Sequence, residues 1–291
     1  MKDVWKKYLG SMIIRRIAKW SIGLLAVGYI AICTWFYMFQ EYVLFAPNTD
    51  PTDLPTDRSD RERTGLEFRQ GWFHPRDPKP EAEIHYREYR AKDSVGVILF
   101  LPGNRGNLQK CRFQPEVFIE AGYDVWTMEY RKYGYSEGLL SEEALLDDAQ
   151  TMYDIVKEKH KEQAIVVWGR SLGSGMAAYI ASKNKPRMLV LETPYYSLVD
   201  CVRNSYPFIP EALFRYKFPT HNYLDTVACH AHLIHGDADE KIYYGSSKKL
   251  EERHGSEVTV HTIEGGKHNL RTDNGIRSTA FDEKVKLILG R

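Results

Sequence analysis

The sequence predicts an α/β fold, in which helices flank a mostly parallel central sheet, preceded by one membrane-spanning helix. Three observations lead to this prediction. Short apolar runs alternate with helix-length amphipathic segments through most of the 291 residues, an uncharged stretch near the N-terminus is long enough to cross a bilayer, and polar motifs follow directly after apolar runs. The length suits one large domain in addition to the membrane segment.

The composition excludes several classes of protein. Lys and Arg number 40 and Asp and Glu 39, so the net charge of +1 shows none of the basic excess that a nucleic-acid-binding protein carries. Hydrophobic residues make up 43% of the chain, which is too many for a disordered protein. Four cysteines in this length exclude a small disulfide-stapled scaffold. We therefore expect an ordered protein with no nucleic-acid partner.

The charge is distributed unevenly along the chain. Residues 1–19 hold six Lys or Arg against one Asp, so this stub carries +5 and the remainder carries −4. Residues 20–40 (WSIGLLAVGYIAICTWFYMFQ) contain no charge, and as a helix they would span about 30 Å, the thickness of the hydrocarbon core of a bilayer. Aromatic residues at both ends suit the two membrane interfaces. We expect a basic stub at 1–19 and a transmembrane anchor at 20–40.

Two alternatives to an anchor are a buried core helix and a cleaved signal peptide. Core helices are rarely apolar on every face over this length. The apolar run is also longer than the core of a typical signal peptide, and no small-residue cleavage site follows it. By the positive-inside rule, the stub stays in the cytoplasm and the rest of the chain is exported, into the periplasm if the organism is bacterial.

Residues 41–64 form the expected linker, because the part from 47 to 62 is rich in Pro, Asp and Thr. One domain is expected over 65–291. Its strands are expected at 65–73, 83–90, 94–103, 124–130, 164–169, 187–194, 231–237 and 257–266, and its helices at 141–160 (with Ser141 as N-cap), 172–183, 243–254 and 278–289. The irregular segment at about 195–228, rich in proline and aromatic residues, predicts a small cap over the carboxyl edge of the sheet.

The strongest functional motif is GRSLG, in which Gly169, Ser171 and Gly173 follow an apolar strand and precede a helix. This strand–turn–helix context is the one that a nucleophile elbow needs. The serine would occupy a strained turn, the glycines would let strand and helix approach closely, and the helix would direct its N–H groups at developing negative charge. The alternative is a turn of small residues that only packs the helix on the strand.

A nucleophilic serine needs a base and an acid, and in this fold they follow in the order Ser, Asp, His. The candidate base is His268, which follows the last apolar strand and two glycines. Asp237 and Asp239 are acid candidates. We favour Asp239, which lies one turn beyond the strand end, with Asp237 capping that turn. Glu192, also at a strand end, is a weaker candidate.

The oxyanion hole is expected to use the N–H of Leu172 and the N–H of Asn104, in the loop after the 94–103 strand. A simple Gly/Asn turn would also explain that loop. The segment with His230, His232 and His235 invites a metal site, but no carboxylate or cysteine pattern frames it, so no metal and no cofactor is expected. The sequence leaves open whether Cys201 and Cys229 form a disulfide.

Five ordered motifs carry a resemblance to a known family. They are PGNRGN (102–107), YRKYGYSEG (130–138), GRSLG (169–173), HGDADEKI (235–242) and GKHN (266–269). From about residue 65 to the C-terminus the chain resembles the α/β-hydrolase superfamily, and within it the membrane-anchored, short-cap branch grouped with serine-aminopeptidase-like acyl hydrolases. The resemblance implies the α/β-hydrolase fold with a short cap, Ser171 as nucleophile, Asp239 as acid, His268 as base, and oxyanion donors at Asn104 and Leu172.

The chain departs from the family pattern at two positions. Pro102 stands where the family has the His of an HGN turn, and we expect it to alter how the oxyanion loop is held. Lys132 stands in place of a Gly, and we expect no effect on the site.

The expected function is a membrane-anchored serine hydrolase that cleaves an ester or thioester through an acyl-enzyme, as lysophospholipases and deacylases do. Its expected partners are an acyl-ester or lipid-like small molecule and the bilayer around residues 20–40. The alternatives are a serine peptidase similar to aminopeptidases, a non-catalytic scaffold at the membrane, and metal-dependent hydrolysis.

Overall fold

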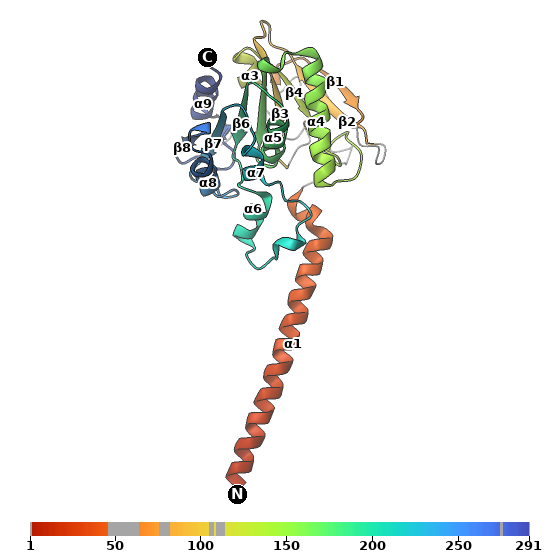
Figure 1. Cartoon of the computed structure of the whole chain (residues 1–291), viewed down its shortest axis with the longest axis vertical. Helices are drawn as coiled ribbons and strands as arrows, with labels where there is room; N and C mark the ends of the chain where they lie inside the picture. Colours follow the sequence, from red (N-terminus) through yellow and green to blue (C-terminus); the bar gives the residue numbers. More distant parts are fainter. Residues whose placement is uncertain are drawn as a thin grey trace.

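The computed structural model describes residues 2–45, 64–75, 82–104, 108, 114–273 and 276–290. Most of the expected linker at 41–64, and the part of the PGNRGN motif at 105–107, lie outside the described residues. A long N-terminal helix and an α/β domain make up the described chain, and Figure 1 shows the helix extending like a stalk from one end of the domain.

Helix α1 (Lys2–Leu44) runs for 43 residues without a break, so it continues from the basic stub through the expected membrane segment. Its portion Arg15–Leu44 is long and apolar enough to cross a membrane, by length and composition. Every residue from 15 to 32 is exposed, whereas Phe36, Gln40 and Leu44 are buried against the domain. The helix therefore has a free apolar shaft and a packed C-terminal end.

The core of the domain is an eight-stranded sheet in the order β1-β2-β4-β3-β5-β6-β7-β8. Its strands are β1 (Phe68–Phe73), β2 (Ile84–Tyr89), β3 (Gly96–Leu101), β4 (Tyr123–Met128), β5 (Ile165–Arg170), β6 (Met188–Glu192), β7 (Ala231–Gly236) and β8 (Val258–Ile263). Strands β3 to β8 run parallel to one another, whereas β2 pairs antiparallel with both β4 and β1. All eight expected strands, and the mostly parallel sheet, are confirmed.

Helices cover both faces of the sheet, because the apolar strands must be buried on both sides. Alternate residues of β3 show this: Val97 and Leu99 belong to one apolar cluster, and Ile98 and Phe100 to the other. The first cluster includes residues of α4 (Glu142–Lys159), α5 (Leu172–Lys183), α7 (Thr220–Leu224) and α8 (Gly245–His254), and the second those of α3 (Glu116–Glu120) and α9 (Thr279–Leu289).

The four expected helices are confirmed as α4, α5, α8 and α9. Ser141 is the N-cap of α4, and its side chain accepts a hydrogen bond from Ala144 N at 3.0 Å, which satisfies one of the free N–H groups at the helix start. The five-residue helix α3 was not expected, because one turn is too short to show a period. A two-stranded ribbon, β9 (Thr272–Asp273) with β10 (Ile276–Arg277), precedes α9.

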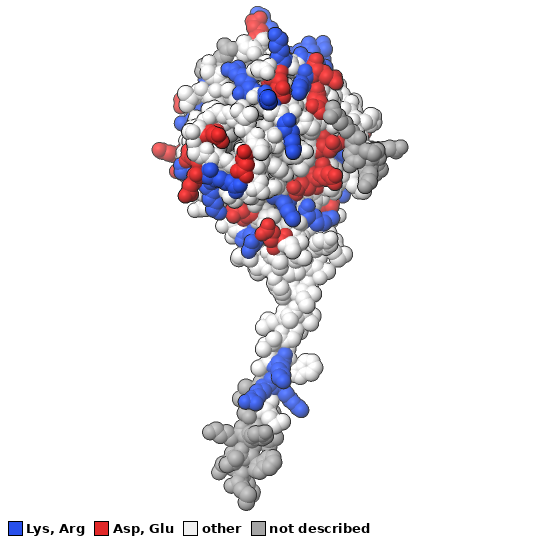
Figure 2. Space-filling view, in the orientation of Figure 1, with Lys and Arg blue, Asp and Glu red and all other residues white. Residues whose placement is uncertain are grey.

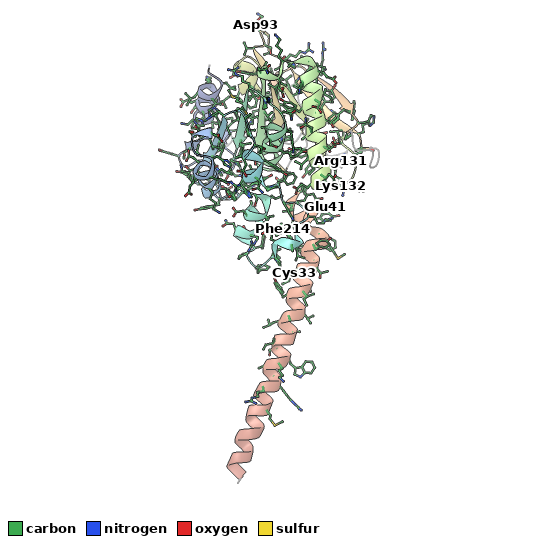
Figure 3. The ribbon with its side chains drawn as sticks, viewed as in Figure 1. Cys33, Glu41, Asp93, Arg131, Lys132 and Phe214 are labelled. Atoms are coloured by element: carbon green, nitrogen blue, oxygen red, sulfur yellow. The ribbon has the colours of Figure 1, made fainter. Side chains whose placement is uncertain are left out.

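The expected cap corresponds to the connection between β6 and β7, with α6 (Leu198–Ser205), the 3-10 turn η3 (Glu211–Leu213) and α7. The C-terminal end of α1 packs against it, with the ring of Phe36 5.0 Å from that of Phe214 and the ring of Phe45 4.7 Å from that of Tyr216. The buried Gln40 side chain donates to Leu213 O at 3.1 Å. Figure 3 shows Phe214, Glu41 and Lys132 at this junction.

Candidate active site

The GRSLG motif forms a sharp turn between β5 and α5. Ser171 lies at this turn with φ 50° and ψ −116°, in a region that favours glycine, and α5 begins at the next residue. The turn is held by the hydrogen bond from Ser171 N to Glu192 O at 2.8 Å. This is the strand–turn–helix geometry that the motif predicts for a nucleophile elbow.

The two flanking glycines make the elbow possible. A Cβ atom on Gly169 would collide with Gly173 O and with the Ala177 side chain. A Cβ atom on Gly173 would collide with the backbone oxygens of Leu101 and Pro102 at the end of β3. Both positions therefore need glycine so that α5 can approach the sheet.

The structure brings Ser171, Asp239 and His268 together from the carboxyl ends of β5, β7 and β8. His268 Nε2 lies 3.1 Å from Ser171 Oγ, and His268 Nδ1 lies 2.8 Å from Asp239 Oδ2. Because an ionised carboxylate only accepts, Nδ1 carries a proton and Nε2 is free to accept from the serine hydroxyl. The Asp239 carboxylate is buried and the His268 ring is 14% exposed, so this chain of hydrogen bonds opens to solvent at the serine end.

The two aspartates after β7 have different partners. Asp239 Oδ1 accepts from the backbone N–H groups of Lys241 and Ile242, at 2.8 and 2.9 Å. Asp237 Oδ1 accepts from Gly265 N at 2.7 Å and so ties its own turn to the loop before the histidine. Asp239, and not Asp237, lies beside His268.

A second histidine, His235, supports the same carboxylate from behind. Its buried Nε2 lies 3.2 Å from Asp239 Oδ2 and 3.1 Å from Ile242 O, and its Nδ1 lies 2.7 Å from Ser247 Oγ. Nε2 therefore carries a proton, because both of its partners are acceptors. Burial raises the pKa of Asp239, but the hydrogen bonds from His235 and His268 outweigh it and hold that pKa well below its usual range. This contact was not expected from the sequence. The signal that could have indicated it is a histidine at the end of an apolar strand, four residues before Asp239.

Glu192, the weaker acid candidate, has another set of partners. Its fully buried carboxylate accepts from Trp168 Nε1 at 3.2 Å and from Arg271 at 2.8 Å, and it lies 3.1 Å from Arg170 Nε. Burial raises the pKa of Glu192, but the two arginines lower it further, so the net shift is downward. Because Arg170 precedes Ser171 and Arg271 follows His268, Glu192 joins the end of β5 to the loop that carries His268.

The loop after β3 lies against the nucleophile, as expected for an oxyanion loop. A Cβ atom on Gly103 would be 3.4 Å from Ser171 Cβ and 3.9 Å from Ser171 Oγ. Leu172 begins α5 directly after the serine. The roles of the Leu172 and Asn104 N–H groups as oxyanion donors stay predictions.

Two tyrosines hold this loop where the family has a histidine. Tyr130 OH donates to Pro102 O at 2.6 Å, and Tyr133 OH donates to Asn104 O at 2.9 Å. The Asn104 side chain reaches the end of α1, with Nδ2 3.4 Å from Leu44 O. The loop is therefore held by residues of the YRKYG motif and by the N-terminal helix.

The second departure from the family pattern affects the backbone. Lys132 has φ 64°, in the left-handed region where glycine is favoured and another residue costs about 1 kcal/mol. Its Nζ lies 3.0 Å from Glu41 Oε2, which ties the motif to α1. The lysine thus has a left-handed backbone at the position where the family has a glycine, and it adds a contact with the helix.

The three histidines around β7 do not share one site. His235 supports Asp239, whereas the rings of His230 and His232 are 4.7 Å apart, and His232 Nδ1 lies 3.0 Å from His261 Nε2 on β8. Among the residues that the structure describes, no group of three or more His, Cys, Asp or Glu side chains is placed to hold a metal ion.

Cys201 and Cys229, whose pairing the sequence left open, are free thiols in the structure. Burial raises the pKa of each thiol to about 11. Both cysteines are therefore protonated and weakly nucleophilic at neutral pH.

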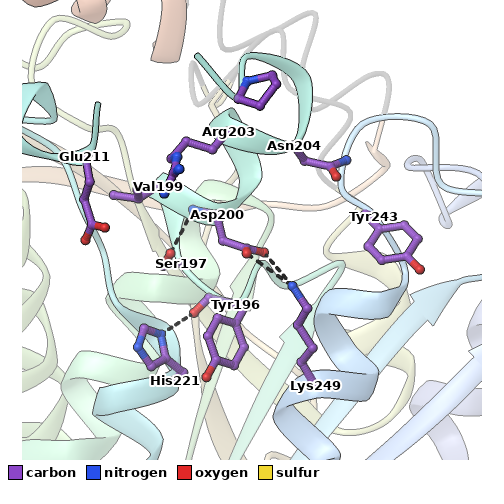
Figure 4. A pocket seen from close by; sticks show the side chains of 11 residues that line it. Tyr196, Ser197, Val199, Asp200, Arg203, Asn204, Glu211, His221, Tyr243 and Lys249 are labelled. Carbon is purple, nitrogen blue, oxygen red and sulfur yellow. Dashed lines mark hydrogen bonds and ion pairs between the residues drawn. The ribbon is translucent and has the colours of Figure 1, made fainter. Parts of the chain in front are cut away.

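A surface pocket of about 440 Å³ lies between the cap and α8 (Figure 4). Asp200 of α6 and Lys249 of α8 form an ion pair across it at 3.2 Å. Tyr196 and His221 stack at its base with ring centres 4.2 Å apart, and His221 Nδ1 lies 2.9 Å from Tyr196 O. These contacts attach the cap to the domain.

Comparisons with known proteins agree with this fold. Residues 96–224 match the family model described as the alpha/beta hydrolase fold. Among solved structures, the esterase Pf2001 of Pyrococcus furiosus superposes with a TM-score of 0.63 at 16% identity, covering 84% of this chain and 97% of that one.

Curated relatives match over part of their length. The lysophosphatidylserine lipase ABHD12 of Danio rerio is 28% identical over 200 residues, 57% of this chain and 51% of that protein. The uncharacterized protein YfhR of Escherichia coli O157:H7 is 27% identical over 187 residues, 62% of each chain. The chain thus spans about half the length of the lipase it matches. With the sheet order, the family match over residues 96–224 and the structural neighbours in agreement, the chain has the α/β-hydrolase fold.

Proposed function

We propose that the chain is a membrane-anchored serine hydrolase that cleaves carboxylic esters or thioesters of acylated, lipid-like substrates. The observation that carries the proposal is the continuous hydrogen-bonded series Ser171, His268 and Asp239, with separations of 3.1 and 2.8 Å. Nucleophile, base and acid within hydrogen-bond reach of one another, in this order along the chain, are the arrangement required for acyl transfer.

The reaction follows from the protonation states of the site. His268 Nε2 removes the hydroxyl proton as Ser171 Oγ attacks the carbonyl carbon, and the N–H groups of Leu172 and Asn104 stabilise the oxyanion. The ionised Asp239 stabilises the imidazolium that forms. His268 then gives the proton to the leaving alkoxide or thiolate, and a water molecule, activated by the same histidine, releases the acid from the acyl-enzyme.

An ester of a lipid is the favoured substrate class for two reasons. The matching curated relatives include lysophosphatidylserine lipases, and lysophosphatidylserine carries one acyl ester in a molecule that partitions into membranes. The candidate site also lies close to the apolar N-terminal helix, since Asn104 of the oxyanion loop contacts Leu44 at the end of α1.

The structure supports an uncleaved anchor over the two alternatives. A core helix would be buried, whereas the apolar residues from 15 to 32 are all exposed. A cleaved signal peptide would leave the mature domain intact, whereas Phe36 and Leu44 of this helix, and Phe45 directly after it, belong to the domain's own core cluster. With Arg15, Arg16 and Lys19 before the apolar segment, the proposed orientation keeps the N-terminus in the cytoplasm and exports the domain.

The proposal is tested with the full chain in detergent. A fluorophosphonate probe should label Ser171, and nitrophenyl esters of increasing chain length should be hydrolysed by the wild type. Ser171→Ala should lose the label and almost all turnover, while Ser182→Ala, a matched change further along α5, should keep both. A folded wild type that leaves Ser171 unlabelled, or an unchanged ester rate in Ser171→Ala, would exclude the mechanism. Faster cleavage of aminoacyl nitroanilides than of esters would assign a peptidase instead.

A further inference from the structure

The cap reaches further along α1 than the rest of the domain does. Tyr29 OH donates to Phe208 O at 2.9 Å, and Gln40 Nε2 donates to Leu213 O at 3.1 Å. Tyr29 lies inside the uncharged segment 20–40. The part of the cap from α6 to η3 therefore lies beside the segment that is proposed to cross the membrane.

The exposed part of α1 below the cap is too short to cross the hydrocarbon core of a bilayer. The exposed, uncharged residues from 20 to 32 span about 20 Å as a helix, and the hydrocarbon core is about 30 Å thick. About 10 Å of hydrocarbon must then surround residues 33–40, where the cap packs on α1, and any tilt of the helix increases that depth. An insertion of this depth is within the range of proteins that lie in one leaflet.

The surface of the cap at this level suits a membrane interface. Residues 204–210 (NSYPFIP) carry no charge, and Tyr206 and Phe208 are 49% and 50% exposed. On the neighbouring helix Trp35 and Tyr37 are exposed as well, so both elements present exposed aromatic side chains, which membrane interfaces favour. Figure 2 shows uncharged side chains at the lowest edge of the domain and along the adjoining helix, between the charged side chains higher on the cap and the basic residues near the N-terminus.

A groove opens on this surface between α1 and the cap. It has a volume of about 450 Å³, and it is lined mainly by apolar side chains: Tyr29, Ile30, Cys33, Tyr37, Ala212 and Leu213. The helix that forms one wall of the groove continues to Leu44, whose carbonyl oxygen contacts Asn104 of the oxyanion loop. From Cys33 to Leu44 the helix rises by about 16 Å, so an acyl chain beside α1 would have its ester near the level of the loop.

We infer that the tip of the cap, residues 204–210, inserts into the leaflet on the domain's side, and that the groove holds the acyl chain of a lipid arriving sideways from that leaflet. The inference rests on the proposed membrane anchor and extends the proposed function by stating where the substrate comes from. If the substrate instead reached the site from the aqueous phase and the cap stayed outside the bilayer, the apolar groove and the exposed aromatic residues would be in water. This exposure costs about 25 cal/mol for each Å² of apolar surface.

Insertion of the tip is tested by chemical labelling of the full chain in phosphatidylcholine/phosphatidylglycerol vesicles. Phe208→Cys and, as a control, Leu287→Cys on the exposed face of α9 are treated with a membrane-impermeant maleimide, and labelling is read by peptide mass spectrometry. Leu287→Cys reports the fraction of domains that face outward. We expect Phe208→Cys to be labelled at least tenfold less than this control in intact vesicles and equally after detergent is added. Equal labelling in intact vesicles would overturn the insertion.

Lateral entry is tested with two substrates that share one leaving group. Methylumbelliferyl oleate embedded in the vesicles reports use of a bilayer substrate, and soluble methylumbelliferyl butyrate reports the catalytic site alone. We expect Phe208→Asp and Ala212→Trp to lower the ratio of the oleate rate to the butyrate rate at least tenfold. The matched controls Leu287→Asp and Ala280→Trp, both on α9, should keep the wild-type ratio. An unchanged ratio in both cap variants would overturn the inference, whereas a wild type that cleaves neither ester would contradict the proposed function itself.

Discussion

Two buried carboxylates lie at the ends of neighbouring parallel strands, and they face different kinds of partner. Glu192 at the end of β6 and Asp239 just beyond β7 are both fully buried, and neighbouring cationic or N–H groups hold the pKa of each below its usual value despite burial. Glu192 faces two arginines, whose protons do not leave. Asp239 faces two histidines, whose protons can move.

The difference shows that burial and a strand end do not by themselves define a catalytic acid. A carboxylate beside permanent cations forms a static link between loops, whereas the same group beside imidazoles can stabilise a charge that appears during a reaction. The partners' ability to exchange a proton decides between the roles. Each residue can be changed to its neutral amide, so the comparison can be tested on both sides.

The largest effect is expected from Asp239→Asn. The amide would present a donor or a weaker acceptor to His268 Nδ1, which favours the wrong tautomer and leaves the imidazolium without its counter-charge, so kcat should fall by about 10³–10⁴. Both ester turnover and the melting temperature are measured. The melting temperature should change far less than it does in Glu192→Gln. Turnover within tenfold of the wild type would remove Asp239 from the mechanism.

Glu192→Gln should have the reverse profile. The buried guanidinium groups of Arg170 and Arg271 would face a neutral amide, and loss of one partner from a buried ion pair costs about 3–5 kcal/mol. For a domain of this size the melting temperature should fall by about 10 °C. Turnover per folded molecule, counted by active-site titration, should fall much less than in Asp239→Asn. A variant that melts with the wild type but has lost turnover would show that Glu192 acts in the chemistry.

The sequence predicts this part of the molecule well because its signals are local. A serine between two glycines, after an apolar run and before a helix, specifies a turn whose geometry depends on few residues, and the six parallel strands, β3 to β8, were recognisable as apolar runs. The three proposed catalytic residues each follow a strand, and parallel strands bring their carboxyl ends to one edge. Their proximity could therefore be predicted without knowledge of distant contacts.

Other features depend on contacts between distant residues, and no local pattern reveals them. Glu192 binds Arg271, which is 79 residues away in sequence, so its role as a link could not be separated from a role as an acid. Gln40 and Leu213, which form a hydrogen bond, are 173 residues apart in the sequence. The sequence predicts a linker from residue 41 and gives no sign that the end of α1 packs in the domain core. The left-handed backbone of Lys132 could be suspected only from the glycine that the family has at this position, because a lysine by itself gives no sign of it.

A third buried carboxylate sharpens the comparison, because it has only one arginine. Burial raises the pKa of Asp148 from its ordinary value of 3.8 to about 6, although Arg131 binds it through two hydrogen bonds of 2.7 and 2.8 Å. The folded state therefore binds the proton more tightly than the unfolded state. Stability should fall as the pH rises from 4 to about 6, by up to about 3 kcal/mol, and then level off.

Asp148→Asn tests this titration. Loss of the partner of Arg131 destabilises the variant at every pH, so the readout is the slope of the melting temperature between pH 4 and 7 and not its absolute value. The wild type should lose stability relative to the variant across this range. Parallel curves for the two proteins would show that Asp148 does not titrate there. Glu192, whose pKa is lowered, should contribute in the opposite direction and only at more acidic pH.

The smallest expected effect concerns His235, a positioning residue that acts through Asp239. His235→Phe removes the hydrogen bond to Oδ2, so the pKa of Asp239 should rise, and the variant should lose activity at a higher pH than the wild type as the pH falls. We expect kcat to fall by about tenfold at neutral pH, about 1.4 kcal/mol. His235→Gln, which can still donate a hydrogen bond, should recover most of the rate. Its activity at acidic pH should also be lost at the same pH as in the wild type. If both variants lose the same activity with unshifted pH profiles, His235 only fills space, and the contrast between the two carboxylates rests on His268 alone.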